Sequence, residues 1–489
     1  MYSPVPPAAS KTIAFFIANA LIVGCMSSAD RNAIGSGTNV LPQTSALQRV
    51  GAMPPKLLFG DAARESVLYG FSSGRDGAGP VGSLVWHKDG AFFGTTQSGG
   101  GSSQCTISSG VTGCGTVFEL VPTGSGYTEK VLHRFKGGTD GSYPWAGLTD
   151  GAGSVLFGTT QTGGNSGCTN GSLPTGCGTV FEMTRFARGY TKTSIYAFSG
   201  ADGFGPLGAL TVNASGVIFG TTEFGGNSAC STPAAGCGTV FELRPSGHSY
   251  ALTPIYDFVG GSDGANPYGK LTARAGGGFY GTTGHGGNAA CAYGCGTVFE
   301  LVPGKTGYSE RVLYRFKGGK DGQWPKGALY RDSSGALYGT TEGGGGTSCT
   351  NGAHLNGCGT VFKLTASHGK YSERILYRFK GTNDGAWPYS SLVAHASAFY
   401  GAAWLGGNGG CSYRSDGCGT VFKLTGAGTT YTEGTAYAFK GGTDGAWPLC
   451  TDLGERHSVR HHVHRCRPVP FLRIWNGLQA TAVIVRVLT

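Results

Sequence analysis

The feature that most constrains the fold is a seven-residue motif that recurs along the chain at a nearly constant interval. The first copy, Cys-Gly-Thr-Val-Phe-Glu-Leu, spans residues 114–120, and later copies begin at Cys177, Cys237, Cys295, Cys358 and Cys418. The last two copies carry Lys in place of Glu, at Lys363 and Lys423. A fixed interval of about 60 residues indicates a repeat architecture.

Each repeat contains four segments that favour β-strands. In one full period they lie at 147–149, 155–160, 178–183 and 193–198, rich in β-branched and aromatic residues and bounded by turn formers. No stretch beyond the N-terminal apolar run shows a sustained helical period. Gly accounts for 91 of 489 residues without a strict Gly-X-Y period, which excludes collagen and suits many tight turns.

Four antiparallel strands per repeat are typical of a β-propeller blade. An Asp-Gly turn follows each fourth segment, at Asp76, Asp140, Asp202, Asp263, Asp321, Asp384 and Asp444. These seven turns accompany only six readable second and third segments, and Val67–Phe71 is a fourth-type segment without a blade of its own. We therefore predict an all-β propeller over residues 61–448, with seven blades of which the last is incomplete and shared between the chain ends.

The N-terminus resembles a targeting signal. Lys11 precedes an apolar run over residues 12–24, which is short for a membrane span and of the length of a secretory signal. The run ends Leu-Ile-Val-Gly-Cys25, similar to a bacterial lipobox, and Met26 after it favours the outer membrane. We predict a lipoprotein-type signal at 1–25 with Cys25 as the lipid anchor, and a flexible tether at 26–60. An ordinary signal peptide with an unrelated Cys is the alternative.

Three motifs recur in fixed order: Tyr-Gly-Thr-Thr-x-x-Gly-Gly, Gly-Cys-Gly-Thr-Val-Phe-Glu-Leu and Val-Leu-Tyr-x-Phe-x-Gly-Gly-x-Asp-Gly-x-x-Pro. Over about residues 66–448 they resemble the GloVer tandem repeat of bacterial choice-of-anchor surface proteins. The resemblance implies an exported, anchored repeat protein, and it implies no known enzymatic activity and no established ligand.

Twelve of the fifteen cysteines fall in six local pairs, each spanning the loop between the second and third segments. An exported protein with evenly paired Cys is expected to be disulfide-bonded. Zinc binding by thiolates is the alternative, but one pair per blade cannot easily gather four ligands. We predict the disulfides Cys105–Cys114, Cys168–Cys177, Cys230–Cys237, Cys291–Cys295, Cys349–Cys358 and Cys411–Cys418.

No cofactor, metal or catalytic site is predicted from the repeats. One Asp per turn offers too few oxygens for calcium, and the repeated Glu119, Glu182, Glu242 and Glu300 are better explained by cross-strand pairs than by a catalytic pair. The aromatic residues beside the Asp-Gly turns are more suggestive. We predict that they either stack on sugar rings or anchor a protein partner, with packing between blades as the alternative: Tyr143, Trp145, Trp324, Trp387 and Trp447.

The repeat stops after Pro448, and residues 449–489 form an aberrant tail rich in Arg and His. The segment 455–465 can be encoded so that a reading one base later gives Asn-Gly-Thr-Leu-Tyr-Gly-Thr-Thr-Tyr-Thr-Gly, the motif expected there. We interpret the tail as the product of a frameshift, and a His/Cys metal site as the less favoured alternative.

The net charge of +10 comes from scattered Lys and Arg and from the tail, which argues against nucleic-acid binding. The expected function is therefore extracellular, non-catalytic binding or adhesion by a bacterial outer-membrane or cell-surface lipoprotein, with a glycan or surface protein as partner. A carbohydrate-active enzyme (a polysaccharide lyase or hydrolase) and a purely structural protein are the alternatives. An enzyme should break the repeat symmetry with polar residues on one face, and Ala402, Ala403 and Trp404 are the main departures noted.

Overall fold

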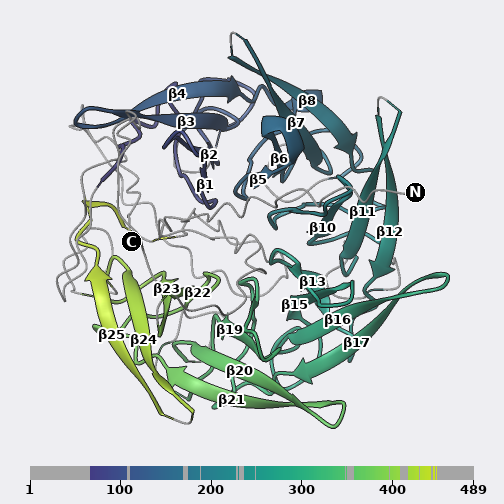
Figure 1. Ribbon diagram of the computed structural model, residues 1–489, viewed down its shortest axis with the longest axis vertical. Helices are drawn as coiled ribbons and strands as arrows, with labels where there is room; N and C mark the ends of the chain where they lie inside the picture. Colours follow the sequence, from purple (N-terminus) through teal and green to yellow (C-terminus); the bar gives the residue numbers. More distant parts are fainter. Residues whose placement is uncertain are drawn as a thin grey trace, which may run out of the picture.

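The computed structural model describes residues 67–448, apart from 107–110, 169–174, 188, 227–229, 231–235, 248, 347–348, 350–356, 396, 408–416, 429, 442–443 and 447. The described residues form six antiparallel sheets arranged around a common centre as the blades of a β-propeller (Figure 1). The predicted all-β propeller with four-stranded blades is confirmed. The predicted signal, Cys25, tether and aberrant tail lie outside the described residues.

The blades follow one another in chain order. Blade 1 contains β1 (Val85–Trp86), β2 (Phe92–Thr96), β3 (Thr116–Thr123) and β4 (Gly126–Arg134); blade 2 contains β5 (Thr149–Asp150), β6 (Val155–Thr160), β7 (Thr179–Phe186) and β8 (Gly189–Ala197); blade 3 contains β9 (Thr211–Val212), β10 (Ile218–Thr222), β11 (Thr239–Ser246) and β12 (Ser249–Asp257). Two short 3-10 turns, Gly138–Asp140 and Ala152–Ser154, flank β5.

Blade 4 has its first strand in two pieces, so its sheet contains β13 (Ala265–Pro267), β14 (Thr272–Ala273), β15 (Phe279–His285), β16 (Thr297–Gly304) and β17 (Gly307–Arg315). Blade 5 contains β18 (Tyr330–Arg331), β19 (Leu337–Thr341), β20 (Thr360–Ser367) and β21 (Lys370–Arg378); blade 6 contains β22 (Val393–His395), β23 (Ala398–Ala403), β24 (Thr420–Ala427) and β25 (Thr430–Ala438). In each blade the first strand lies nearest the centre of the ring and the last strand lies at its rim (Figure 1).

A β-bulge in every outer hairpin turns one apolar side chain towards the next blade. In blade 4, Val298 pairs with Tyr314 and Phe299 pairs with Val312, so Leu313 has no partner in the ladder. The register shifts at the same Val-Phe step in the other five blades. A bulge of this kind re-aims side chains, and Leu313 is packed in the hydrophobic cluster between blades 4 and 5.

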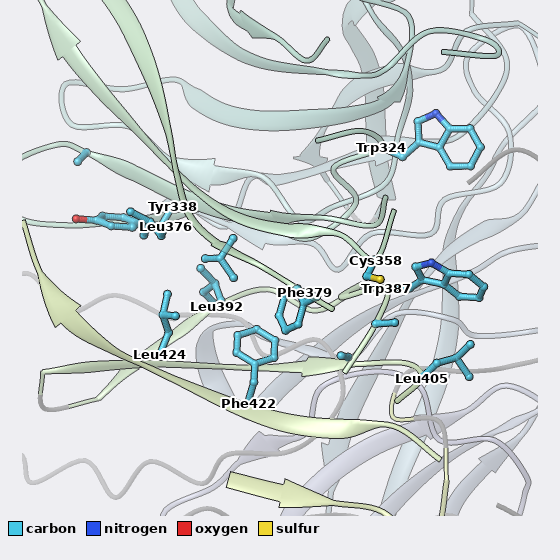
Figure 2. Close-up of a cluster of buried hydrophobic side chains, with 14 residues drawn as sticks. Trp324, Tyr338, Cys358, Leu376, Phe379, Trp387, Leu392, Leu405, Phe422 and Leu424 are labelled. Carbon is cyan, nitrogen blue, oxygen red and sulfur yellow. The ribbon is translucent and has the colours of Figure 1, made fainter. Parts of the chain in front are cut away.

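Phenylalanine pairs connect neighbouring blades. Phe316 follows β17, and its ring lies edge-on to Phe362 of blade 5 with 5.0 Å between centroids. Figure 2 shows the next joint, where Phe379 and Phe422 lie close together with Leu392 and Leu424 to one side of them. The centroid distances at the remaining joints are 4.9–5.3 Å, and the pairs are Phe135–Phe181, Phe198–Phe241, Phe258–Phe299 and Phe379–Phe422.

The structure describes six blades, so the prediction of seven is wrong for this part of the chain. In the segment Val67–Phe71, only Val67 takes part in a β-bridge, and the segment is not a strand. The side chains still take their expected place, because Phe71 packs against Phe118 with 4.9 Å between ring centroids.

The Gly in each Tyr-Gly-Thr-Thr motif is required because a phenyl ring crosses its backbone. A Cβ on Gly281 of β15 would lie 2.3 Å from Cζ of Phe299 on the adjacent strand, and the same arrangement recurs in the other blades. We expect Gly281→Ala to lower the free energy of unfolding by about 1–3 kcal/mol through overpacking. Gly434 of β25 is the matched control, because nothing lies within 4 Å of its Cβ position. Urea denaturation of both variants checks this, and equal stabilities would contradict it.

Candidate ligand-binding face

Two variable positions of the repeat lie side by side on one face of the ring. Because the strands of a blade alternate in direction, the connections from second to third strand and from one blade to the next emerge on the same face. Isolated β-bridges join these two connections in five blades, as between Gln323 and Gly343 in blade 5, and β13 makes the same pairing in blade 4. The residue after Thr-Thr and the residue after the turn Pro therefore meet at this face.

The residues at these positions differ between the two sides of the ring. In blades 1 and 2, and after the turn Pro of blade 3, none of these residues is ionisable. They are Val81, Gln97, Trp145, Gln161 and Leu207. From the residue after Thr-Thr in blade 3 onwards to blade 6, charged and aromatic residues dominate these positions. We call the following set the arc: Glu223, Tyr268, Lys326, Glu342, Tyr389 and Trp404.

Lys326 lies at the centre of the arc. Its Nζ is 2.7 Å from Oε2 of Glu342, and the two side chains are 13% and 3% exposed. The ammonium lies 5.0 Å from the ring centroid of Tyr268 and 4.8 Å from that of Tyr389, within the range of cation–π attraction. Since Tyr268 and Tyr389 come from the flanking blades, Lys326 connects three blades at this face.

Both carboxylates of the arc accept hydrogen bonds from tyrosines of the following blade. The hydroxyl of Tyr268 donates to Oε1 of Glu223 at 2.5 Å, and the hydroxyl of Tyr389 donates to Oε1 of Glu342. Hydrogen bonds to charged acceptors are stronger than neutral ones. These bonds fix the orientation of both rings, which stay partly exposed.

Trp404 closes the arc at blade 6. Its ring centroid lies 5.5 Å from that of Trp387 and 5.8 Å from that of Tyr389. Its backbone N–H donates to the carbonyl of Trp387 at 3.2 Å. The departure noted at Trp404 in the sequence therefore lies within the cluster that breaks the repeat symmetry.

The aromatic residues predicted to bind a ligand are placed differently from the arc. Tyr143, Trp324 and Trp387 are buried, with exposed fractions of 0%, 7% and 4%. Trp145 is partly exposed, and Trp447 lies outside the described residues. The three buried rings match the packing alternative, and ligand binding by the five predicted residues remains an untested prediction.

The buried rings point to the disulfide loop of the preceding blade. The indole Nε1 of Trp324 donates to the carbonyl of Gly294 at 3.0 Å, and that of Trp387 donates to Gly357 at 3.3 Å. In Figure 2, Trp387 lies beside Cys358 and Leu405. Both residues have positive φ, 60° and 57°. That backbone costs about 1–3 kcal/mol for a residue other than Gly, so the packing of the indoles must offset it.

His285 and Asn266, both in blade 4, form a chain of contacts next to the arc. Nδ1 of His285 is 2.9 Å from Oδ1 of Asn266, whose Nδ2 donates to the backbone carbonyl of Glu223 at 2.8 Å. The His285 ring lies edge-on to Trp324 with 5.4 Å between centroids. This chain of contacts positions the Glu223 end of the arc relative to blade 5.

Five of the six predicted disulfides are present: Cys105–Cys114, Cys168–Cys177, Cys230–Cys237, Cys291–Cys295 and Cys349–Cys358. Cys418 is also disulfide-bonded, and its predicted partner Cys411 lies outside the described residues. Disulfides persist in oxidising compartments, which favours a location outside the cytoplasm. Among the described residues no helix is long and apolar enough to cross a membrane.

The repeated carboxylates are engaged within the fold. Glu119 and Glu300 pair across the outer hairpins with Lys130 at 3.5 Å and Arg311 at 2.8 Å, and Glu242 pairs with its neighbour Arg244. The Asp of each turn accepts a hydrogen bond from the backbone of its own loop, as Asp321 does from the Lys317 N–H at 2.7 Å. Within the part of the chain that the structure describes, no group of three or more His, Cys, Asp or Glu is placed to hold a metal.

The arc was largely missed by the sequence reasoning, although a signal was present. Aligning the six repeats shows Gln, Gln, Glu, Gly, Glu and Trp after the second strand, and Val, Trp, Leu, Tyr, Lys and Tyr after the turn Pro. Both columns vary inside an otherwise constant frame. Positions that diverge within a uniform repeat are where an asymmetric site can be built.

Comparison with known proteins supports the repeat assignment. The Gloeobacter/Verrucomicrobia repeat matches residues 166–350, which confirms the resemblance of the motifs to this family over that segment. A comparison with curated protein sequences gives no match.

Several solved structures share a general likeness with the chain. An ulvan lyase of polysaccharide lyase family PL25 is 11% identical, with 76% of this chain and 86% of that chain covered and a TM-score of 0.43. A protein from Lactobacillus plantarum is 10% identical, with 71% and 82% covered and a TM-score of 0.41. A gluconolactonase from Xanthomonas campestris is 13% identical, with 69% and 85% covered and a TM-score of 0.37. At these values the fold assignment depends on the strand pairing described above, and the activities named belong to those proteins.

Proposed function

We propose that this protein is a non-catalytic binding protein of the cell exterior, and that it binds carbohydrate on the arc. The observation that carries the proposal is the confinement of the ionisable residues at these positions, together with three of the four partly exposed aromatic residues, to one side of one face. Aromatic rings offer flat apolar surfaces together with a polar edge. Carboxylates and an ammonium add the few oriented polar groups that fix a ligand in a binding site.

The chemistry of the arc suits a sugar better than an apolar ligand. Tyr268 and Tyr389 are held rigidly by their bonds to Glu223 and Glu342, so little conformational entropy is lost when a ring stacks on them. The exposed parts of Tyr268 in blade 4 and of Tyr389 and Trp404 in blade 6 come from two blades, and a chain of several sugar units can contact all three. In this proposal the predicted lipid on Cys25 and the tether at 26–60 hold the propeller at the outer membrane.

A glycan array tests the proposal with the purified protein after removal of residues 1–25. We expect binding to one class of polysaccharide, and the double variant Tyr268→Ala/Tyr389→Ala should bind at least about tenfold more weakly, since each anchor of this kind contributes more than 1 kcal/mol. The matched control is Trp145→Ala, which removes an aromatic residue at the same repeat position on the other side of the ring.

Four outcomes would contradict the proposal. An equal loss of glycan affinity in the double variant and in Trp145→Ala would exclude the arc as the specific site. A loss of affinity in Trp145→Ala alone would place binding on the opposite side of the ring. Release of new reducing or unsaturated sugar ends from a bound polysaccharide would show an enzyme. Binding of no glycan would leave the protein-partner and structural alternatives.

A further inference from the structure

The charged groups of the arc are engaged with one another, and this limits the charge that a ligand can carry. The two carboxylates, of Glu223 and Glu342, and the one ammonium, of Lys326, give the arc a formal charge of −1. The other residues at the same repeat positions on this side of the ring are uncharged: Tyr268, Gly284, Tyr389 and Trp404. A ligand therefore meets a slightly negative surface whose ammonium is already paired.

A ligand anion would have to compete with Glu342 for Lys326. The Lys326 Nζ lies 2.7 Å from Oε2 of Glu342, and the two side chains are only 13% and 3% exposed. Taking the ammonium out of this pair would leave a buried carboxylate without its counter-charge, which is strongly unfavourable. The Glu342 carboxylate would also repel the incoming anion. A uronate or sulfate group is therefore disfavoured at the centre of the arc.

A ligand cation is disfavoured by the position of the same ammonium. The Lys326 Nζ lies 5.0 Å from the ring centroid of Tyr268 and 4.8 Å from that of Tyr389. It occupies the place between the two rings where aromatic faces beside a carboxylate would attract a cation. The ammonium of an amino sugar stacked on either ring would approach Lys326 as a like charge.

The hydroxyl groups of the two tyrosines favour a ligand that donates hydrogen bonds. Each of them donates its own hydrogen to a carboxylate, Tyr268 to Glu223 at 2.5 Å and Tyr389 to Glu342. A ligand group that bonds to these phenolic oxygens must therefore be the donor. A sugar hydroxyl can donate in this way, whereas an ionised carboxylate can only accept.

We infer that the arc binds uncharged polysaccharides and discriminates against polymers that carry carboxylate, sulfate or ammonium groups. Sugar rings stack on Tyr268, Tyr389 and Trp404, and sugar hydroxyls donate to the tyrosine oxygens. Lys326 determines this specificity, because its ion pair with Glu342 excludes anions and its place between the rings excludes cations. The inference rests on the proposed function, since it concerns the ligand of the same site.

The test compares polymers that share a backbone and differ in charge, with the purified full-length protein. The pairs are hydroxyethyl and carboxymethyl cellulose, dextran and dextran sulfate, methyl-esterified and de-esterified homogalacturonan, and chitin and chitosan oligosaccharides. Any polysaccharide that binds on the glycan array is also compared with its own derivative in which primary hydroxyl groups are oxidised to carboxylates.

The uncharged member of each pair that binds should do so at least about tenfold more tightly than the charged member. Its affinity should also be unchanged between about 0.01 and 1 M NaCl, over which the screening length falls from about 30 to about 3 Å. These measurements need no variant, so they decide the point even if a variant does not fold.

The double variant Glu223→Gln/Glu342→Gln tests the cause of the selectivity. It keeps the shapes of the side chains and changes the formal charge of the arc from −1 to +1, so the ratio of anionic to uncharged affinity should rise at least about tenfold. The matched control is Asp89→Asn/Asp150→Asn. Both of its residues are exposed and lie where a first strand ends, on the other face of the ring, so the ratio should stay unchanged.

The outcomes separate this inference from the proposed function. Tighter binding of a charged polymer by the unaltered protein would overturn the inference, and so would an equal affinity ratio in the arc variant and the control. In both cases carbohydrate binding by the arc would still stand. Binding of no polysaccharide at all, charged or uncharged, would overturn the proposed function and the inference together.

Discussion

Phe316→Ala is expected to lower the free energy of unfolding by about 3–5 kcal/mol, the usual cost of removing a fully buried phenyl group. Phe316 is 0% exposed, and its ring contacts Phe362 of the next blade and Tyr314 of its own. The loss should be large because the cavity would open between two blades at once. Urea denaturation followed by tryptophan fluorescence measures it.

Phe186→Ala is the matched control for this prediction. Phe186 lies at the end of β7 and is 58% exposed, so its truncation should change stability by less than about 0.5 kcal/mol. If Phe316→Ala proved as mild as Phe186→Ala, the phenylalanine joints would not hold the blades together.

Stability is expected to decrease as the pH rises from about 5 to 8, because carboxyl pairs lie at three of the blade joints and beside the turn that precedes blade 1. Burial, reinforced by the charge of Asp263, raises the pKa of Glu310 to about 8. Asp263 accepts hydrogen bonds from the Tyr256 hydroxyl and the Val259 N–H at 2.7 and 2.9 Å. Burial and a neighbouring turn Asp likewise raise the pKa of three other glutamates, to about 8 for Glu373 and about 7 for Glu129 and Glu433.

The direction of the pH dependence follows from proton binding. A Glu whose pKa is raised in the folded protein binds its proton there at pH values where the unfolded chain has released it. The folded state therefore loses stability between the ordinary pKa of Glu, near 4.5, and the raised folded value. Because these groups are partly exposed, solvent screening limits the effect to on the order of 1 kcal/mol per pair.

The double variant Glu310→Gln/Glu373→Gln tests this expectation. Gln cannot ionise, so the variant should be more stable than the parent at pH 8 and similar to it at pH 5, in urea denaturation at both pH values. Equal pH dependence of the two proteins would contradict the carboxyl-pair account.

Blade 2 offers the opposite case within the same ring. Lys192 replaces Glu there, and its Nζ lies 2.9 Å from Oδ1 of Asp140. Burial opposes the ionisation of Asp140, but hydrogen bonding to His133 and the charge of Lys192 outweigh it and hold the Asp140 pKa well below its usual range. This joint should lose stability only in acid. Lys192→Met should therefore leave unchanged the dependence of the free energy of unfolding on pH between pH 5 and 8.

The fold was predictable because the residues that build a blade are local and repeated. The Thr-Val-Phe motif, the Gly opposite its phenyl ring and the Asp-Gly turn each act within one repeat, so their spacing indicates the strands directly. The number of blades was not predictable in the same way. Phe71 has the side-chain environment of a joint residue without belonging to a strand, because strand formation depends on a neighbour that the motif cannot specify.

The candidate site was predicted less well, for a reason visible at the turn. The residue before the turn Pro, such as Trp387, packs back on the preceding disulfide loop, whereas the residue after it, such as Tyr389, contacts the arc. Sequence reasoning grouped the aromatic residues of both positions together. The ion pair between Lys326 and Glu342 joins residues of two different motifs, and only the ring geometry brings them to the two tyrosines.

The central claim is that one side of one face has diverged from the repeat in order to bind a ligand. Hydrogen exchange measured with and without a saturating array-selected polysaccharide tests it most directly. We expect slower exchange in the connections around Tyr268, Lys326, Glu342 and Tyr389, with no change around Gln97 and Gln161. Protection centred on blades 1 and 2, or spread evenly around the ring, would contradict the account.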